Sequence, residues 1–147
     1  MEILINRIYD AFETAPYPGD DRLICHQCDE CFRLRDDFKG KKPQNVDSNT
    51  VYYHQDSLPL FSDEAKRYFL PAFLRESIMK PDWSITEFLI YSFDSDHRWK
   101  PEGGYTKEQI EIVEEYFDFI EAYIDEFDKD NFESAKLRWL INTEQAG

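Results

Sequence analysis

The sequence predicts an all-α fold, a single compact domain of about six to eight helices around an aromatic-rich core. Apolar residues recur every three or four positions in several segments, and capping residues, prolines and glycines separate those segments. No segment alternates apolar and polar residues for long enough to predict a strand. The chain has 147 residues, and its 12 Phe, 9 Tyr and 3 Trp supply the large rings for one core. We therefore expect residues 1–147 to form one domain.

The N-terminal third of the chain contains three predicted helices. Helical spacing of apolar residues predicts the first over residues 3–13, and the prolines and glycine of Pro16–Gly19 end it. We expect the second over residues 27–39, with Gly40 placed to close it, and a short third helix over residues 47–54. The apolar side of the second helix would consist of Cys28, Cys31, Leu34 and Phe38.

The middle of the chain has two clear helix starts. Ser62, followed by two acidic residues, is typical of a helix N-terminus. Pro71 lies inside the pattern that follows, so we expect either a kink there or two abutting helices, the second over residues 72–79. The capping box Ser84–Glu87 predicts another helix to about residue 93, followed by a loop over residues 94–104.

The strongest helical pattern follows a second capping box, Thr106–Gln109. Large apolar residues then recur at helical spacing, so we expect one long amphipathic helix over about residues 106–128. A last helix is predicted to begin near Asp130 and to continue to about Leu140. The apolar stripe of the long helix would consist of Ile110, Val113, Phe117, Ile120, Ile124 and Phe127.

The chain is strongly acidic, since 17 Lys and Arg against 31 Asp and Glu give a formal net charge of −14. This charge disfavours nucleic acid and anionic membranes as partners and favours a basic protein. The apolar runs are short, so we expect neither a transmembrane helix nor a secretory signal. An odd number of cysteines, three, without an export signal indicates a cytoplasmic protein with free thiols.

The three cysteines lie close together in the sequence, as Cys25, Cys28 and Cys31. Overlapping Cys-x-x-Cys steps could bring thiolates to one Zn²⁺, and His54 could complete a Cys3His site. We expect small buried core residues instead, because strong zinc signals combine two separate steps. A reactive thiol is disfavoured, since the acidic residues after Cys28 would oppose its ionisation. The sequence therefore predicts no cofactor, with zinc as the alternative.

Nine acidic residues and no Lys or Arg occur between Glu108 and Asp128. On a helix, six of them share the face opposite the apolar stripe. Their like-charge i,i+4 pairs cost about 0.2–0.5 kcal/mol each, little beside the ~1.5–3 kcal/mol gained by burying one large apolar side chain. This face is either a plain solvated surface or a docking surface for a cationic protein. We call it the predicted acidic stripe: Glu111, Glu114, Glu115, Asp118, Glu121 and Asp125.

The block that begins at His54 reads HQDSLPLFSDEAKRYFLPAF. It resembles the signature of an uncharacterised bacterial family of small helical proteins, His-x-x-x-Leu-Pro-Leu-x-(Ser/Thr)-x-Glu-Ala-x-Arg-Tyr-(Phe/Tyr)-Leu-Pro-Ala-(Phe/Tyr). The resemblance extends over about residues 25–80 and implies no established activity. Most signature positions are apolar and would form a wall of the core. Arg67 is polar, and we expect it to be buried beside a carboxylate such as Glu64 or Asp56, or to contact a small anionic ligand or a partner.

No motif in the sequence assigns a nucleophile, or a base with a neighbour to tune it, so we do not expect an enzyme. The favoured hypothesis is an immunity or inhibitor protein whose carboxylates occupy the basic active site of a bacterial toxin, such as a nuclease. Two alternatives stay open: a Cys/His metal-binding domain, and a housekeeping interaction module of unknown activity.

Overall fold

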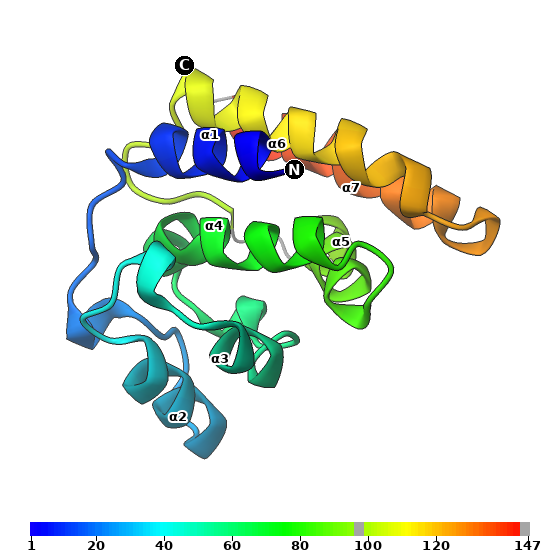
Figure 1. The fold of residues 1–147 in the computed structure, drawn as a ribbon. Coiled ribbons are helices and arrows are strands. Elements are labelled where there is room, and N and C mark those ends of the chain that lie inside the picture. Colours follow the sequence, from blue (N-terminus) through cyan, green and yellow to red (C-terminus); the bar gives the residue numbers. More distant parts are fainter. Residues whose placement is uncertain (96–98, 145–147) are drawn as a thin grey trace.

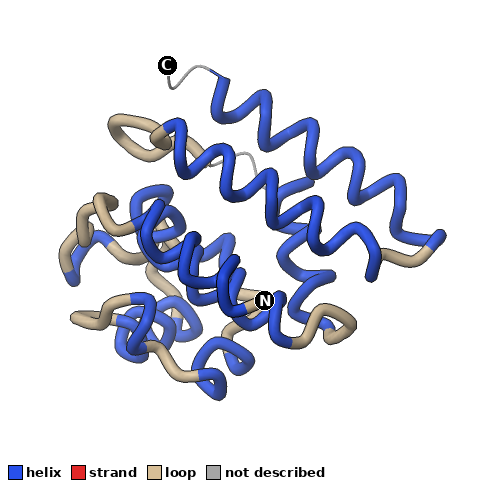
Figure 2. The backbone as a smooth tube through the Cα atoms, turned by 45° about the horizontal axis from the view of Figure 1, so that its top comes forward, coloured by secondary structure: helices blue, strands red, loops and turns tan. Residues whose placement is uncertain are grey.

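Seven α-helices pack around one continuous core in the computed structural model, which describes residues 1–95 and 99–144. The helices are α1 (Glu2–Phe12), α2 (Asp29–Phe38), α3 (Ser48–Tyr53), α4 (Asp63–Met79), α5 (Ser84–Ser95), α6 (Lys107–Ile120) and α7 (Lys129–Glu144). α6 and α7 lie side by side with α1 next to α6, and α4 and α5 pack beneath them (Figure 1). Loops and single helical turns join the helices, and the described residues form no strand (Figure 2). The prediction of a compact all-α domain is therefore confirmed.

Side-chain caps begin α3, α4 and α6 where the sequence predicts helix starts, whereas Ser84 is the first residue of α5 and its hydroxyl donates to Gln55 at 2.9 Å. Ser62 Oγ accepts a hydrogen bond of 3.1 Å from the backbone N–H of the third residue of α4. Thr106 and Gln109 form a reciprocal capping box at the start of α6, with bonds of 3.1 and 2.9 Å. Asp47 caps α3 in the same way at 2.8 Å. Each cap is a hydrogen bond between residues three positions apart in the chain, so the helix starts can be predicted from the sequence.

Pro71 does not divide the helix that contains it. α4 runs without interruption from Asp63 to Met79, so the expectation of two abutting helices is wrong. Proline removes one backbone donor, but α4 is the central helix, and both of its halves are buried against other helices. Packing on both sides of Pro71 therefore keeps the helix continuous. α5 extends two residues beyond its predicted end, and residues 96–98 of the predicted loop 94–104 lie outside the described residues.

The long helix predicted over residues 106–128 is shorter in the structure. α6 ends at Ile120, and two single turns, Glu121–Tyr123 and Glu126–Asp128, lead to α7. Asp125 has an extended backbone conformation, and its side chain caps the second turn with a 3.0 Å bond from the backbone N–H of Asp128. This local bond competes with helix continuation. Phe127, predicted to be part of the buried stripe, is 92% exposed, which corrects that prediction.

The core contains a group of rings centred on Phe38 of α2, whose ring lies 5.0–6.0 Å from those of Phe61, Phe69 and Phe73. A buried hydroxyl network joins three other helices, because Ser77 of α4 bonds both Thr86 of α5 and Tyr116 of α6, each at 2.7 Å. Burial raises the pKa of Tyr116 above its ordinary value, so its phenol stays neutral. Within the described chain, no helix has both the length and the apolar character needed to cross a membrane.

Candidate functional site

Three of the six side chains in the predicted acidic stripe have basic partners. Glu115 accepts two hydrogen bonds of 2.6 Å from the guanidinium of Arg7 on α1, and this hydrogen bonding lowers the pKa of Glu115. Longer ion pairs join Glu111 to a lysine four positions earlier at 3.9 Å and Glu121 to a lysine of α7 at 3.7 Å. The expectation of a stripe without compensating cations is therefore wrong, because the cations come from outside residues 108–128.

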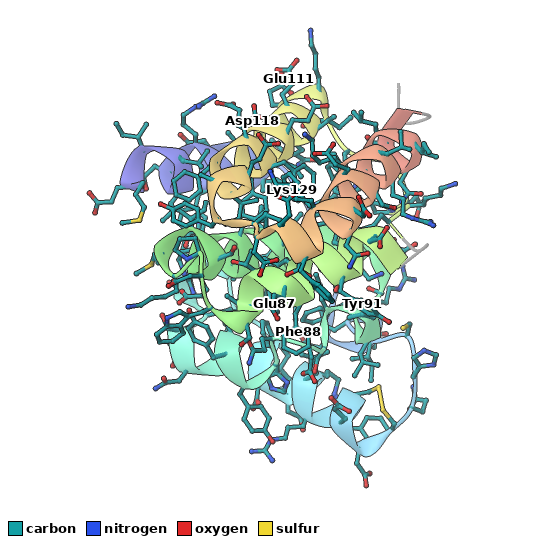
Figure 3. All side chains as sticks on the ribbon, turned by 90° about the vertical axis from the view of Figure 1, so that its right-hand side faces the viewer. Glu87, Phe88, Tyr91, Glu111, Asp118 and Lys129 are labelled. Atoms are coloured by element: carbon teal, nitrogen blue, oxygen red, sulfur yellow. A yellow bond between two sulfur atoms is a disulfide. The ribbon has the colours of Figure 1, made fainter. Side chains whose placement is uncertain are left out.

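The other three members of the predicted stripe do not form one face. Glu114 and Asp118 lie on α6 and form no ion pair with any described residue, and Figure 3 shows Asp118 on the outer side of α6 near Glu111. Asp125 is separated from them by the end of α6 and caps the turn before α7. α6 alone therefore offers a small acidic surface rather than a continuous docking stripe.

A second acidic surface lies between α5 and the turns that follow α6. It is a cavity of about 690 Å³, which we call the acidic groove. Its lining residues come from within the segments 56–59, 81–94 and 123–131. Lys129 lies in the last segment but does not line the cavity, and none of the described lining residues is Lys, Arg or His. Six carboxylates line the groove: Asp56, Asp82, Glu87, Asp94, Asp125 and Asp128.

Most of the negative charge in the acidic groove is not neutralised within the domain. Arg138 forms an ion pair with Asp94 at 3.3 Å, and Asp125 accepts the capping bond described above. The remaining carboxylates form no ion pair with the described part of the chain: Asp56, Asp82, Glu87 and Asp128. Their charges are therefore available to a cationic ligand.

Three partly exposed aromatic rings lie among these carboxylates. Trp83 is 49% exposed, Tyr91 65% and Tyr123 50%. Figure 3 shows Tyr91 on α5 beside Glu87 and Phe88, which also line the groove. The face of such a ring attracts a guanidinium or ammonium group, and a carboxylate can accept paired bonds from arginine. The groove therefore combines the two kinds of group that bind basic side chains.

The cysteines and His54 are not brought together as a metal site. Cys28 and Cys31 form a disulfide, and Cys25 lies outside it. Cys31 is buried as expected, whereas Cys28 and Cys25 are exposed, which corrects the prediction that they are free core thiols. The buried ring of His54 bonds Asp37 at 2.7 Å instead. No group of three potential ligands occurs among the described residues, and the zinc alternative stays a prediction.

Arg67 is buried, but it pairs with no carboxylate among residues 1–95 and 99–144. Its guanidinium donates to the backbone carbonyl oxygens of Glu102 at 3.1 Å and Gly104 at 2.6 Å. Glu64, one of the two expected partners, accepts a 3.4 Å bond from the backbone N–H of Glu102. Arg67 therefore holds the segment before α6 to the core, and its contact with a small anionic ligand or a partner stays a prediction. These two bonds could not be predicted from the sequence, because every residue has a backbone carbonyl group and residue types do not indicate which one accepts.

Sequence analysis also missed most of the acidic groove. Of its carboxylates, only Asp125 belongs to the predicted stripe. The walls come from three segments that are far apart in the sequence, so no local spacing indicates the cavity. One signal was present in Tyr91, because it lies on α5 away from the positions that the apolar pattern buries.

Comparisons of the chain with models of protein families, with characterised proteins and with solved structures found no match. The resemblance of residues 25–80 to a bacterial family therefore stays a prediction. Function has to be inferred from the charges, rings and cavity of the chain itself.

Proposed function

We propose that the protein is a protein-binding domain whose acidic groove takes a basic segment of a protein partner. The observation that carries the proposal is the lining of the groove, with six carboxylates, three half-exposed rings and no cationic side chain among the described lining residues. A net charge of −14 would speed the approach of a basic partner through long-range attraction.

The rings support a protein partner rather than a simple cation. Trp and Tyr are enriched among the residues that dominate protein interfaces, since each buries a large flat surface at little entropic cost. Trp83 is already held in place, because its ring centroid lies 5.3 Å from that of Tyr52 and the Lys80 ammonium lies over the ring at 5.0 Å. A ring fixed in this way loses little freedom when a partner covers it.

The specific role that we propose is that of a cytoplasmic immunity or inhibitor protein for a basic, nuclease-like bacterial toxin. Nucleases bind phosphate through positive grooves, and a carboxylate-rich surface can occupy such a groove by mimicking the charge of nucleic acid. Glu114 and Asp118 on α6 would extend the acidic surface beyond the groove. In this role the protein acts by binding and needs neither a cofactor nor a catalytic residue.

A binding experiment tests the groove. Fluorescein-labelled nona-arginine is titrated with the full chain, and fluorescence anisotropy gives the affinity. The double variant Asp82→Lys/Glu87→Lys is compared with Glu13→Lys/Asp21→Lys, which changes exposed residues outside the groove by the same charge. We expect at least about a tenfold greater loss of affinity in the groove variant, which corresponds to about 1.4 kcal/mol. Equal losses would show that only net charge matters and would contradict the groove.

A second experiment separates the inhibitor role from basic-segment binding in general. Purified toxin nuclease domains with basic isoelectric points are assayed with and without the protein. We expect stoichiometric inhibition of at least one of them, weaker in high salt and abolished in the Asp82→Lys/Glu87→Lys variant. Binding of nona-arginine without inhibition of any nuclease would leave the groove intact and refute the inhibitor role.

A further inference from the structure

The disulfide lies at the start of a helix and joins an exposed cysteine to a buried one. Cys28 is the N-cap residue of α2, and Cys31 is the third residue of that helix. Their Cα atoms are 5.0 Å apart, within the range of ordinary disulfides. The sequence Cys-His-Gln-Cys-Asp-Glu-Cys therefore places the pair within a single helical turn.

The two cysteines differ in their exposure to solvent. Cys28 is exposed, whereas Cys31 is 0% exposed and packs beneath α2 on the same side as Leu34 and Phe38. A thiolate attacks a disulfide along the line of its two sulfur atoms, so access decides which sulfur is attacked. An external thiol can reach Cys28 and displace Cys31, while the reverse attack is blocked by the core.

The helix start also favours the reduced form of Cys28. The backbone N–H of Cys31 points at Cys28 Sγ, 3.2 Å away, and the N-terminus of α2 carries a partial positive charge. Asp29 and Glu30 act in the opposite direction, although the Glu30 carboxylate is turned to Ser57, whose hydroxyl donates to it at 3.2 Å.

From this geometry we propose that Cys28 and Cys31 form a thiol–disulfide exchange site whose substrates are dithiols and disulfides. A thiolate of an external dithiol attacks Cys28 Sγ, the Cys28–Cys31 bond breaks, and Cys31 leaves as a thiolate that takes up a proton. The second thiol of the reductant then attacks its own sulfur in the mixed disulfide and releases Cys28. In total, two electrons and two protons pass to the protein, and the reductant becomes a disulfide.

A structural role for the same disulfide is less consistent with its place in the fold. The bond closes a loop of only a few residues, and the stabilisation that a disulfide gives is smallest for short loops. In a reducing compartment, disulfides are mostly catalytic or redox-sensing. The proposal is independent of the acidic groove, whose walls do not include Cys28 or Cys31.

Mass spectrometry of the full chain tests the redox step. The native protein is equilibrated with mixtures of reduced and oxidised dithiothreitol, quenched with acid and alkylated with N-ethylmaleimide. We expect a single two-electron transition that places alkyl groups on Cys28 and Cys31 together, and we expect it to be unchanged by Cys25→Ser within about twofold. Thioredoxin, a protein dithiol, should reduce the same bond without denaturant.

Trapping tests which sulfur is attacked. In a Cys25→Ser background, the Cys31→Ala variant should form a mixed disulfide with oxidised glutathione at Cys28. The Cys28→Ala variant should react at least about tenfold more slowly, because Cys31 is buried. Circular dichroism and urea unfolding would show that both variants are folded.

Four outcomes would overturn the proposal. The first is that both thiols stay reduced across every dithiothreitol mixture. The second is a disulfide that only denaturant makes reducible, which would be a structural bond. The third is equal reactivity of Cys28 and Cys31. The fourth is one equivalent of zinc bound to the reduced wild-type protein, which would make the cysteines metal ligands.

Discussion

Replacing Arg67 by methionine tests how the segment before α6 is held to the core. The Arg67 guanidinium donates to two backbone carbonyl oxygens, those of Glu102 and Gly104, at 3.1 and 2.6 Å. Methionine keeps much of the volume of the side chain but donates no hydrogen bond, so the change isolates the two bonds from the packing of the aliphatic stem.

The expected loss follows from these contacts. Two hydrogen bonds from a charged donor are worth about 1.5–3 kcal/mol each, or about 3–6 kcal/mol together. Two terms reduce this sum. The Arg67 Nε group is buried without a hydrogen-bond partner, and its removal returns about 1–3 kcal/mol. Glu102 is exposed and Gly104 half-buried, so their carbonyl groups can bind water instead. We expect Arg67→Met to lower the free energy of unfolding by about 2–3 kcal/mol.

Equilibrium unfolding in urea, followed by circular dichroism, measures this loss. The matched control is Arg22→Met, which removes the same charge from an exposed side chain and should change stability by less than about 0.5 kcal/mol. Hydrogen exchange should also show faster exchange at Gly104, whose backbone N–H bonds the carbonyl oxygen of Pro101. A loss in Arg67→Met no greater than that of the control would refute the assignment of Arg67 as a clamp.

Three further predictions concern stability. Phe38→Ala removes the ring at the centre of the aromatic group and should cost about 3–5 kcal/mol in urea unfolding; a loss under 1 kcal/mol would contradict that position. Ser62→Ala removes the cap of α4 and should cost about 1 kcal/mol by the same measurement, with Ser62→Gly closer to wild type. Because the pKa of Glu115 is lowered by Arg7, the pair stabilises the fold above the unfolded pKa of glutamate, and this is lost as the pH falls through the lowered value. Urea unfolding at several pH values should therefore show a smaller loss of stability on acidification in Glu115→Gln than in wild type. The difference should be small, because both side chains of the pair are about half exposed. An equal loss in the variant and in wild type would argue against the pair.

The parts of the fold that the sequence predicts correctly depend on neighbours in the chain. Ser62 and Thr106 cap helices through bonds to residues three positions later, so residue identity and spacing are enough to find them. The apolar pattern of α6 is similarly readable as far as Ile120, because each member of the stripe faces the same core.

The errors arise where distant packing competes with a local pattern. The apolar rhythm continues from Ile120 to Phe127, yet the chain leaves the helix because Asp125 caps a new turn and α7 must fold back onto α5. At Pro71 the competition has the opposite result, since burial of both halves of α4 outweighs the missing backbone donor. Residue types alone do not predict whether the helix ends or continues at these two places, because the result depends on packing against the surrounding helices.

The candidate site was the least predictable part of the molecule. Arg7 and Glu115 are 108 positions apart in the sequence, and their pairing removes one member from the predicted stripe. The acidic groove forms only when α5 and the turns after α6 meet. A count of charges along one segment therefore identified the acidic character of the chain but could not indicate the acidic groove.

The carboxylates of the groove that form no ion pair can contribute only part of the affinity for a partner. Exposed ion pairs contribute about 0.2–1 kcal/mol each, so the open carboxylates of the groove would mainly set the rate and orientation of approach. A long-lived complex needs buried rings, and truncation of such anchor residues costs 2 kcal/mol or more in typical interfaces. In this chain the half-exposed rings of Trp83, Tyr91 and Tyr123 occupy the same cavity as the open carboxylates. The exposed apolar side chains of α7, by contrast, do not line that cavity. Because the rings and the unpaired charge coincide there, we propose the groove, rather than the helix with the most acidic sequence, as the surface that attracts and retains a basic partner.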